Sequence, residues 1–263
     1  MLTEVHVPDD VSTAVGLIAG GATAMGGGTS LMPWLNDYAS PPTELVSLRR
    51  TGLSGVHIEG STVTIGAATT LAQLEQDQDL NPVVRSIASV PVRNLATVGG
   101  NLFARQPHGD LAVALVALDA RVTLLDDAGT RDLPVEDFVS HDRPSVLVTS
   151  VAFERPAPGT FRYLKAARRR FNSISVVTVA AAITEAGGLV TGSRVALGGV
   201  GPWVIRAHAV EAALTGRPLT EATVSAAAQA GLGEIAPADD AYASAWYRTR
   251  VFPVHLRRAL LGH

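Results

Sequence analysis

Two glycine-rich segments are the residues of this chain best suited to binding a ligand. The first reads Gly26-Gly27-Gly28-Thr29-Ser30 and the second reads Thr97-Val98-Gly99-Gly100-Asn101. Glycine tolerates positive φ angles and lets backbone come close to a ligand, and successive N–H groups in such a turn can surround an anion. Either segment alone is also compatible with an ordinary turn. Together they predict a long phosphorylated ligand held from two sides, for which the diphosphate of a dinucleotide is the natural candidate.

Other kinds of chemistry are excluded or disfavoured by composition. The chain has no cysteine, so it can form no disulfide, thiolate nucleophile or cysteine-ligated iron–sulfur cluster. Its seven histidines are scattered without an HxH or HExxH pair, which predicts no metal site. A net charge of −3 gives no electrostatic reason to bind nucleic acid or an anionic membrane. The short basic run Arg168-Arg169-Arg170 is typical of a solvated turn or a partner contact.

The length and hydrophobic content predict a sizeable buried core. The 263 residues suffice for one large domain or two modest ones, with 47% hydrophobic and 17% charged residues. Residues 1–5 lack the basic and apolar regions of a signal peptide, and the longest apolar stretch, 174–183, is about half a membrane span. We therefore expect a soluble, cytoplasmic protein that does not enter the membrane.

Hydrophobic periodicity and capping residues predict a mixture of helices and strands. Helices are expected over 9–20, 31–35, 70–75, 82–90, 110–118, 207–214, 221–231 and 243–261, and strands over 22–25, 44–48, 56–59, 62–66, 120–125, 147–153, 161–166, 176–184 and 193–197. Asp9, Asp10 and Ser12 are candidate caps of the first helix, and Pro253 predicts a kink or break in the last. The proline- and glycine-rich stretch 155–159 is the expected domain boundary.

Several stretches together resemble one family. They are the segment 24–31, the block 87–102 that contains RNLATVGGN, the segment 107–120, Tyr163-Leu164-Lys165 with Arg168-Arg169, the segment 195–202, Tyr247-Arg248 and the segment 257–260. The resemblance is to the FAD-binding medium subunit of molybdenum hydroxylases of the carbon monoxide dehydrogenase and xanthine dehydrogenase type. It covers the whole chain, and the long block is its most specific part.

The resemblance implies a fold and a location for the cofactor. The fold class would be α+β, with an α/β-like FAD-binding region of two subdomains over residues 1–155. Residues 160–263 would form an α+β domain with a small antiparallel sheet. FAD would lie in the cleft between the two, the place where a large flat ligand is expected.

The resemblance also implies cofactor-binding residues, none of them catalytic. The first group would wrap the diphosphate: Ala24, Met25, Gly26, Gly27, Gly28, Thr29, Ser30 and Leu31. The second group would form a second strap: Thr97, Val98, Gly99, Gly100 and Asn101. The resemblance further implies contacts to the cofactor from Ile87, Asp110, Val148 and Lys165. From the residues alone, Asp110 is equally a helix N-cap and Lys165 equally a solvent-facing strand residue.

The family supplies partners for such a chain, namely a small iron–sulfur subunit and a large molybdopterin subunit, in a heterotrimer that is sometimes doubled. The chain would be the oxidoreductase component that passes electrons from the clusters to FAD and then to NAD, oxygen, a quinone or another acceptor. Where the family often has an aspartate after the paired arginines, this chain has Asn172-Ser173-Ile174-Ser175, which leaves the acceptor open.

Two alternatives to this function stay open at the level of sequence. The chain could be a free-standing FAD-dependent oxidase or dehydrogenase acting on a small molecule, with His57, His108 and His141 as loose acid–base candidates. It could also be an interaction module that has lost FAD, although the intact glycine segments argue against that.

Overall fold

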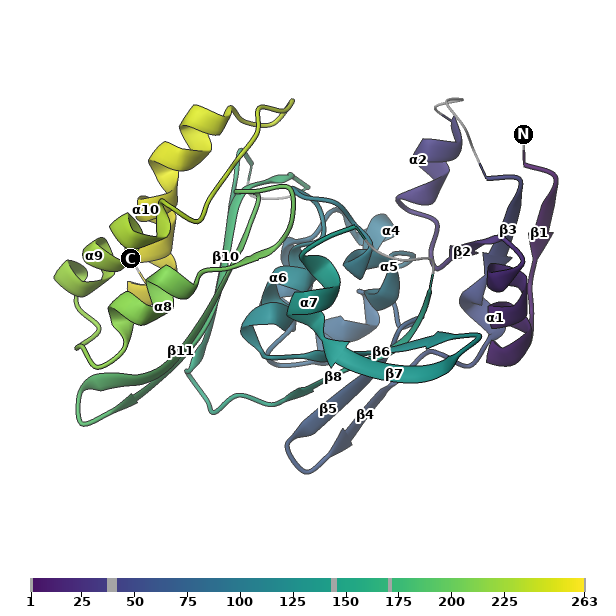
Figure 1. Cartoon of the computed structure of the whole chain (residues 1–263), viewed down its shortest axis with the longest axis horizontal. Helices are drawn as coiled ribbons and strands as arrows, with labels where there is room; N and C mark the ends of the chain where they lie inside the picture. The colour runs from purple at the N-terminus through teal and green to yellow at the C-terminus, as the bar shows by residue number, and fades with distance from the viewer. Residues whose placement is uncertain (1, 37–41, 143–145, 170–171, 263) are drawn as a thin grey trace.

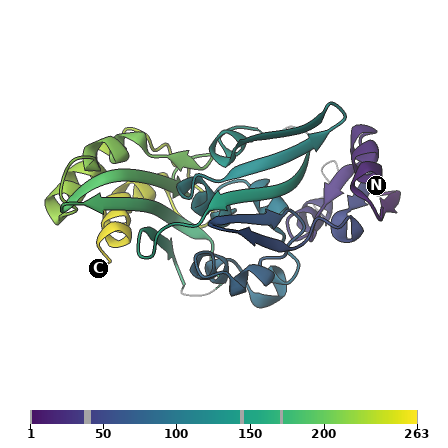
Figure 2. The same ribbon diagram turned by 90° about the horizontal axis from the view of Figure 1, so that it is seen from below.

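Three parts of the chain lie in a row, with the termini at opposite ends (Figures 1 and 2). The computed structural model describes residues 2–36, 42–142, 146–169 and 172–262. We call the residues up to Glu154 the N-terminal lobe, which holds two of the three parts, and those from Phe161 onward the C-terminal lobe.

The N-terminal part is a small parallel sheet of order β1-β3-β2. Its elements are β1 (Glu4–His6), α1 (Val11–Ala19), β2 (Thr23–Met25), α2 (Leu31–Asn36), β3 (Glu44–Ser47) and the 3₁₀ turn η1 (Leu48–Arg50). Asp10 caps α1 by accepting a hydrogen bond of 2.8 Å from the N–H of Thr13, as one of the candidate caps predicts. Ala14 and Ile18 of this helix pack against Val46 of the sheet.

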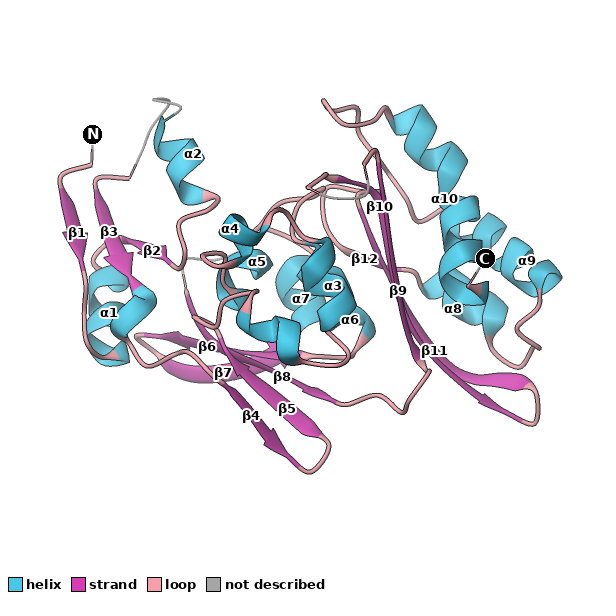
Figure 3. Ribbon diagram, turned by 180° about the vertical axis from the view of Figure 1, so that it is seen from behind, coloured by secondary structure: helices cyan, strands magenta, loops and turns pink. Residues whose placement is uncertain are grey.

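The middle part is a five-stranded antiparallel sheet of order β4-β5-β8-β6-β7 with helices on one face (Figure 3). Its strands are β4 (Val56–Glu59), β5 (Thr62–Gly66), β6 (Arg121–Asp126), β7 (Gly129–Pro134) and β8 (Leu147–Glu154). Its helices are η2 (Gln73–Gln76), α3 (Asn81–Ser86), α4 (Val90–Arg93), α5 (Val98–Leu102), α6 (Asp110–Ala117) and α7 (Val135–Val139).

The C-terminal lobe is an antiparallel sheet of order β12-β11-β10-β9 backed by three helices (Figure 1). Its elements are β9 (Phe161–Ala167), β10 (Ser175–Ala186), β11 (Leu189–Gly198), β12 (Ile205–Arg206), α8 (His208–Leu214), α9 (Glu221–Gly231) and α10 (Ala245–Leu261). The helices α8, α9 and α10 cover one face of this sheet, and α6 of the N-terminal lobe lies against the other. The expected α+β class with a small antiparallel C-terminal sheet is confirmed.

Helix α6 joins the cores of the two lobes. All eight of its residues are buried, as expected of a helix that is apolar on every side. Ala180, Ala196 and Val204 of the C-terminal lobe belong to the same apolar cluster as this helix. The lobes therefore share one continuous hydrophobic core across the contact between them.

Some expected elements differ in the structure. The helix expected over 82–90 ends at Ser86, because Ala88 has a φ of 48° and Pro91 begins a new helix, α4. The helix expected over 70–75 is only the short turn η2. Helix α10 runs unbroken through Pro253, because Phe252 and Leu256 are anchored in the core of the C-terminal lobe. In the described ranges, no helix is both long and apolar enough to cross a bilayer.

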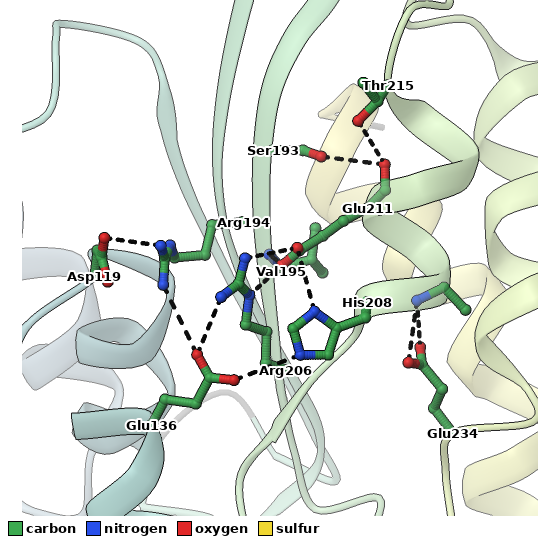
Figure 4. Close-up of polar contacts among 11 residues, drawn as sticks. Asp119, Glu136, Ser193, Arg194, Val195, Arg206, His208, Glu211, Thr215 and Glu234 are labelled. Atoms are coloured by element: carbon green, nitrogen blue, oxygen red, sulfur yellow. Dashed lines mark hydrogen bonds and ion pairs between the residues drawn. The ribbon is translucent and has the colours of Figure 1, made fainter. Parts of the chain in front are cut away.

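A network of charged side chains also joins the lobes at the end of α6 (Figure 4). One Oε atom of Glu136, on α7, lies 3.2 Å from Arg206 Nη1 and 3.8 Å from Arg194 Nη1. Its other Oε atom lies 3.5 Å from His208 Nε2. Just after α6, Asp119 pairs with Arg194 at 2.8 Å. Two acidic groups of the N-terminal lobe thus face three basic groups of the C-terminal lobe.

Glu211 on α8 contacts two of these basic groups, Arg206 and His208, within the C-terminal lobe. It accepts hydrogen bonds of 2.9 and 3.0 Å from Arg206 and one of 2.8 Å from the N–H of Val195. The Glu211 carboxylate, with help from Glu136, raises the pKa of Arg206, which stays charged. Glu136 therefore meets a fixed cation.

Glu136→Gln should lower the free energy of unfolding by about 1 kcal/mol, because it removes the carboxylate charge that faces Arg194 and Arg206, while both arginines keep another carboxylate partner. Urea unfolding followed by circular dichroism measures this change. Glu221→Gln is the matched control, since it breaks the Arg257 ion pair within the C-terminal lobe. The unfolding is repeated at higher salt concentration. If salt changed the two losses of unfolding free energy equally, the network between the lobes would matter no more than the Arg257 ion pair, which would contradict the prediction.

Candidate functional site

The first glycine segment forms the loop between β2 and α2. Gly28 has a φ of 72°, which favours glycine. The backbone N–H groups of residues 27–30 donate no hydrogen bond to any other described residue. This loop therefore has four neighbouring main-chain donors that are free for a ligand, and whether they bind one stays a prediction.

The second glycine segment is the start of helix α5, and its amides are already used. Thr97 caps the helix by accepting a hydrogen bond of 3.2 Å from the N–H of Gly100. The N–H of Val98 donates to Thr69 O at 2.9 Å, and that of Gly99 donates to Ala67 O at 2.8 Å. These amides are satisfied inside the protein, so any free main-chain donors for a diphosphate come from the first segment.

The glycines of the first segment also let it pack against the residues that precede α5. A Cβ atom on Gly26 would lie 2.4 Å from Thr97 Oγ1, and one on Gly27 would lie 1.6 Å from the carbonyl oxygen of Leu95. No real side chain tolerates such distances. The two glycine segments are thus brought together, and the absence of side chains serves contact between them as well as access for a ligand.

Asn101 presents an unsatisfied acceptor beside these loops. Its side chain is buried, with 8% of the residue exposed, and its Oδ1 atom has no hydrogen-bond partner among the described residues. A buried polar atom without a partner is uncommon in native structures and calls for a specific explanation, of which a hydrogen bond to a bound molecule is one. The Asn101 amide therefore fits a site that receives a donor from a bound molecule.

Asp110 and Lys165 form a buried ion pair between the lobes. Lys165 Nζ lies 2.9 Å from Asp110 Oδ2, and each side chain is 7% exposed. Asp110 is the first residue of α6 and Gly109 is the N-cap, so the N-cap role considered for Asp110 is wrong. The solvent-facing alternative for Lys165 is wrong too, because β9 points this side chain at the other lobe.

Two hydroxyl groups complete the surroundings of Asp110. Its Oδ1 atom accepts hydrogen bonds of 2.5 Å from Ser175 and 2.6 Å from Thr178, both fully buried on β10. Sequence reasoning missed both residues as members of the site. The sequence signal that could have identified them is that they are the two polar residues in the otherwise apolar stretch 174–183.

A second link between the lobes runs through Ser86 at the end of α3. Lys165 Nζ donates to the carbonyl oxygen of Ser86 at 3.0 Å, and the Ser86 hydroxyl is 3.0 Å from the Tyr163 hydroxyl. Burial raises the pKa of Tyr163 well above its usual value, so the phenol stays protonated near neutral pH. These contacts hold β9 against the residues that lead into Ile87.

Ile87 and Val148, the two apolar residues implied for the site outside residues 24–31 and 97–101, are both core residues. Ile87 is 9% exposed, and its carbonyl oxygen accepts a hydrogen bond of 3.0 Å from Arg93, which also pairs with Glu75. Val148 is 3% exposed and lies in β8 opposite Leu124. Whether either one contacts the cofactor stays a prediction.

Lys165→Met should lower the free energy of unfolding by about 3–5 kcal/mol, because it leaves the Asp110 carboxylate buried without its counter-ion. Asp110→Asn should cost a similar amount, and the double variant less than the sum of the two. Urea unfolding of the three variants gives the coupling energy. Additive losses would show that the two charges do not act on each other.

Comparisons with known proteins identify the family. Residues 2–153 match the family model of the FAD-binding domain in molybdopterin dehydrogenase, and residues 162–262 match that of the carbon monoxide dehydrogenase flavoprotein C-terminal domain. The chain is 28% identical to the carbon monoxide dehydrogenase medium chain of Hydrogenophaga pseudoflava, over 98% of this chain and 95% of the relative. It is 30% identical to the 6-hydroxypseudooxynicotine dehydrogenase complex subunit alpha of Paenarthrobacter nicotinovorans, over 97% of this chain and 92% of the relative.

The fold agrees with this assignment. A solved structure of carbon monoxide dehydrogenase from Hydrogenophaga pseudoflava superimposes with a TM-score of 0.92 at 29% identity, covering 99% of this chain and 96% of that one. The unclaimed amides of residues 27–30 and the unpartnered Asn101 oxygen fit a dinucleotide. The chain therefore belongs to the family of FAD-binding subunits of molybdenum-containing dehydrogenases, and its cofactor is FAD.

Proposed function

We propose that this chain carries electrons from iron–sulfur clusters on a partner subunit to FAD and from FAD to an external acceptor. The observation that carries the proposal is the absence of cysteine from a redox protein. Without thiolates the chain cannot hold the clusters itself. In the described ranges, the one group of histidine and carboxylate side chains close enough to share a metal ion is Glu4, His6 and Glu44, on β1 and β3. Iron–sulfur clusters that deliver electrons to the flavin would therefore belong to another protein.

The residues of this chain have the task of holding the cofactor in one orientation. The amides of residues 27–30 would bind the diphosphate, and Asn101 Oδ1 would accept a hydrogen bond from FAD. Lys165, held by Asp110 and Ser86, would present its ammonium group to the flavin. When bound, FAD supplies the redox centre, while the protein supplies orientation and electrostatics.

The division of the chain at residues 155–160 supports a cofactor between two units, 1–155 and 160–263. The strand β8 ends at Glu154 and β9 begins at Phe161. The two family models meet on either side of the same stretch. The other residues implied for the site, from Ala24 to Leu31 and from Thr97 to Asn101, with Ile87, Val148 and Asp110, remain part of this proposal.

The proposed partners are a small iron–sulfur subunit and a large molybdopterin subunit. The names of the relatives support this, since those proteins are a medium chain and a subunit of a complex. The alternative, a free-standing flavoprotein, lacks an evident acid–base pair. His57 is exposed on the edge strand β4, His141 contacts Ser140, and burial lowers the pKa of His108.

Purification of the chain from its native host under mild conditions tests the proposal. We expect iron and molybdenum to co-purify with it in fixed ratio to FAD. Under anaerobic conditions the oxidisable substrate of the complex should bleach the flavin only while the partners are attached. A metal-free, FAD-containing protein whose flavin a small molecule reduces directly would favour the free-standing enzyme instead.

Gly27→Ala should abolish stoichiometric FAD retention, because its Cβ atom would collide with the backbone of Leu95 and displace the loop that offers the four amides. Gly16→Ala, on helix α1 and outside both glycine segments, is the matched control, since nothing lies within 4 Å of the Cβ it would add. We expect it to keep FAD. The ratio of flavin absorbance to protein absorbance reports retention, and a yellow Gly27→Ala protein would refute the assignment.

A further inference from the structure

A pocket of about 260 Å³ opens beside Lys165 at the upper end of the C-terminal sheet. It is lined by Ser86, Lys165, Ala167, Arg168, Arg169 and Ser173. Lys165 is the buried member, and Arg168 and Arg169 are exposed just beyond the end of β9. The basic run singled out in the sequence therefore lies next to the ion pair that joins the lobes, although its third member, Arg170, is outside the described residues.

The charge of this pocket is positive and unbalanced. Lys165 is neutralised by Asp110, but Arg168 and Arg169 form no ion pair with any carboxylate in the described part of the chain. No acidic residue is among those lining the pocket. Arginine binds phosphate through a planar fork of N–H donors, and two adjacent arginines at an opening attract an anion.

We propose that Arg168 and Arg169 bind a phosphate group of a second ligand, an electron acceptor that carries phosphate. The proposal rests on the proposed function and names the chemical class of its acceptor. It disfavours neutral acceptors such as a quinone or dioxygen, which gain nothing from two unpaired cations. A pocket of this volume is below the usual range for a whole ligand, so it accommodates one end of such a molecule.

The diphosphate of FAD is the other source of phosphate, and the fold argues against it. The loop with the four unclaimed amides follows β2, whereas Arg168 and Arg169 follow β9. The loop packs against Leu95 and Thr97, between α4 and α5, and none of its residues is among those that line the pocket. The cofactor has one diphosphate, and its main-chain donors are in this loop.

Binding of two probes that differ by one phosphate tests the proposal. The probes are nicotinamide mononucleotide and nicotinamide riboside, titrated by calorimetry into the FAD-loaded, oxidised chain. We expect the mononucleotide to bind about tenfold or more tightly than the riboside, the difference that hydrogen bonds between charged groups supply. Added salt should weaken the binding of the mononucleotide, and the unmodified chain is sufficient to test this.

Variants assign the effect to the two arginines. R168Q/R169Q should bring the affinity for the mononucleotide down to that for the riboside and leave FAD content unchanged. The control R49Q/R250Q removes two exposed arginines that do not line the pocket, and it should bind like the unmodified chain. Equal affinity for the two probes, or unchanged affinity in R168Q/R169Q, would overturn the proposal.

The same titration without FAD separates the two sources of phosphate. Binding of the mononucleotide to both the FAD-free and the FAD-loaded chain supports a second ligand. Binding that disappears when FAD is added would assign the arginines to the cofactor and overturn the proposal. A chain that binds the mononucleotide through the arginines but takes up no FAD would instead refute the proposed function and leave the phosphate site standing.

Discussion

The buried ion pair between Asp110 and Lys165 is the contact on which the arrangement of this molecule depends. It joins the first residue of α6 to the middle of β9, and Ser175 and Thr178 hold the carboxylate from β10. Charges taken out of water are costly unless their partners satisfy them fully. The pair therefore favours one arrangement of the lobes, the arrangement in which ammonium, carboxylate and both hydroxyl groups meet.

The apolar and charged contacts between the lobes reinforce that arrangement. Helix α6 fills the space between the sheet of the middle part and the C-terminal sheet, with the ion pair at its start and the group around Glu136 and Asp119 near its end. Apolar burial supplies most of the attraction, but it is not directional. The polar groups at the two ends of α6 add the orientation that a cofactor between the lobes requires.

The two glycine segments have different roles in spite of their similar composition. The amides of the segment after β2 have no partner among the described residues, while the amides that begin α5 donate hydrogen bonds to Thr69 and Ala67. In both, glycine is needed partly because main chains approach each other closely. Composition predicts where backbone comes close to something, but it does not say whether that partner is a ligand or another part of the chain.

Local signals predicted the elements whose causes are local. Asp10 as a cap, the hairpin of β4 and β5 and the antiparallel C-terminal strands follow from capping, turn residues and alternation. The end of α3 at Ser86 was missed because the positive φ of Ala88 is imposed by its surroundings, where Arg93 reaches back to carbonyl oxygens. The partners of Asp110 were missed for a similar reason. The partner nearest to Asp110 in the chain, Lys165, is 55 positions away. Sequence spacing carries no information about contacts between residues so far apart.

Lys165 is the only lysine of the chain, all other long-chain cations being arginine. Its side chain is 7% exposed and paired with Asp110, so a reagent that acylates primary amines should modify it slowly while the lobes are together. Acylation removes the positive charge, and it would leave the Asp110 carboxylate without its counter-ion. The rate of that single modification would therefore report how firmly the ion pair holds, at the point where the cofactor is expected to lie.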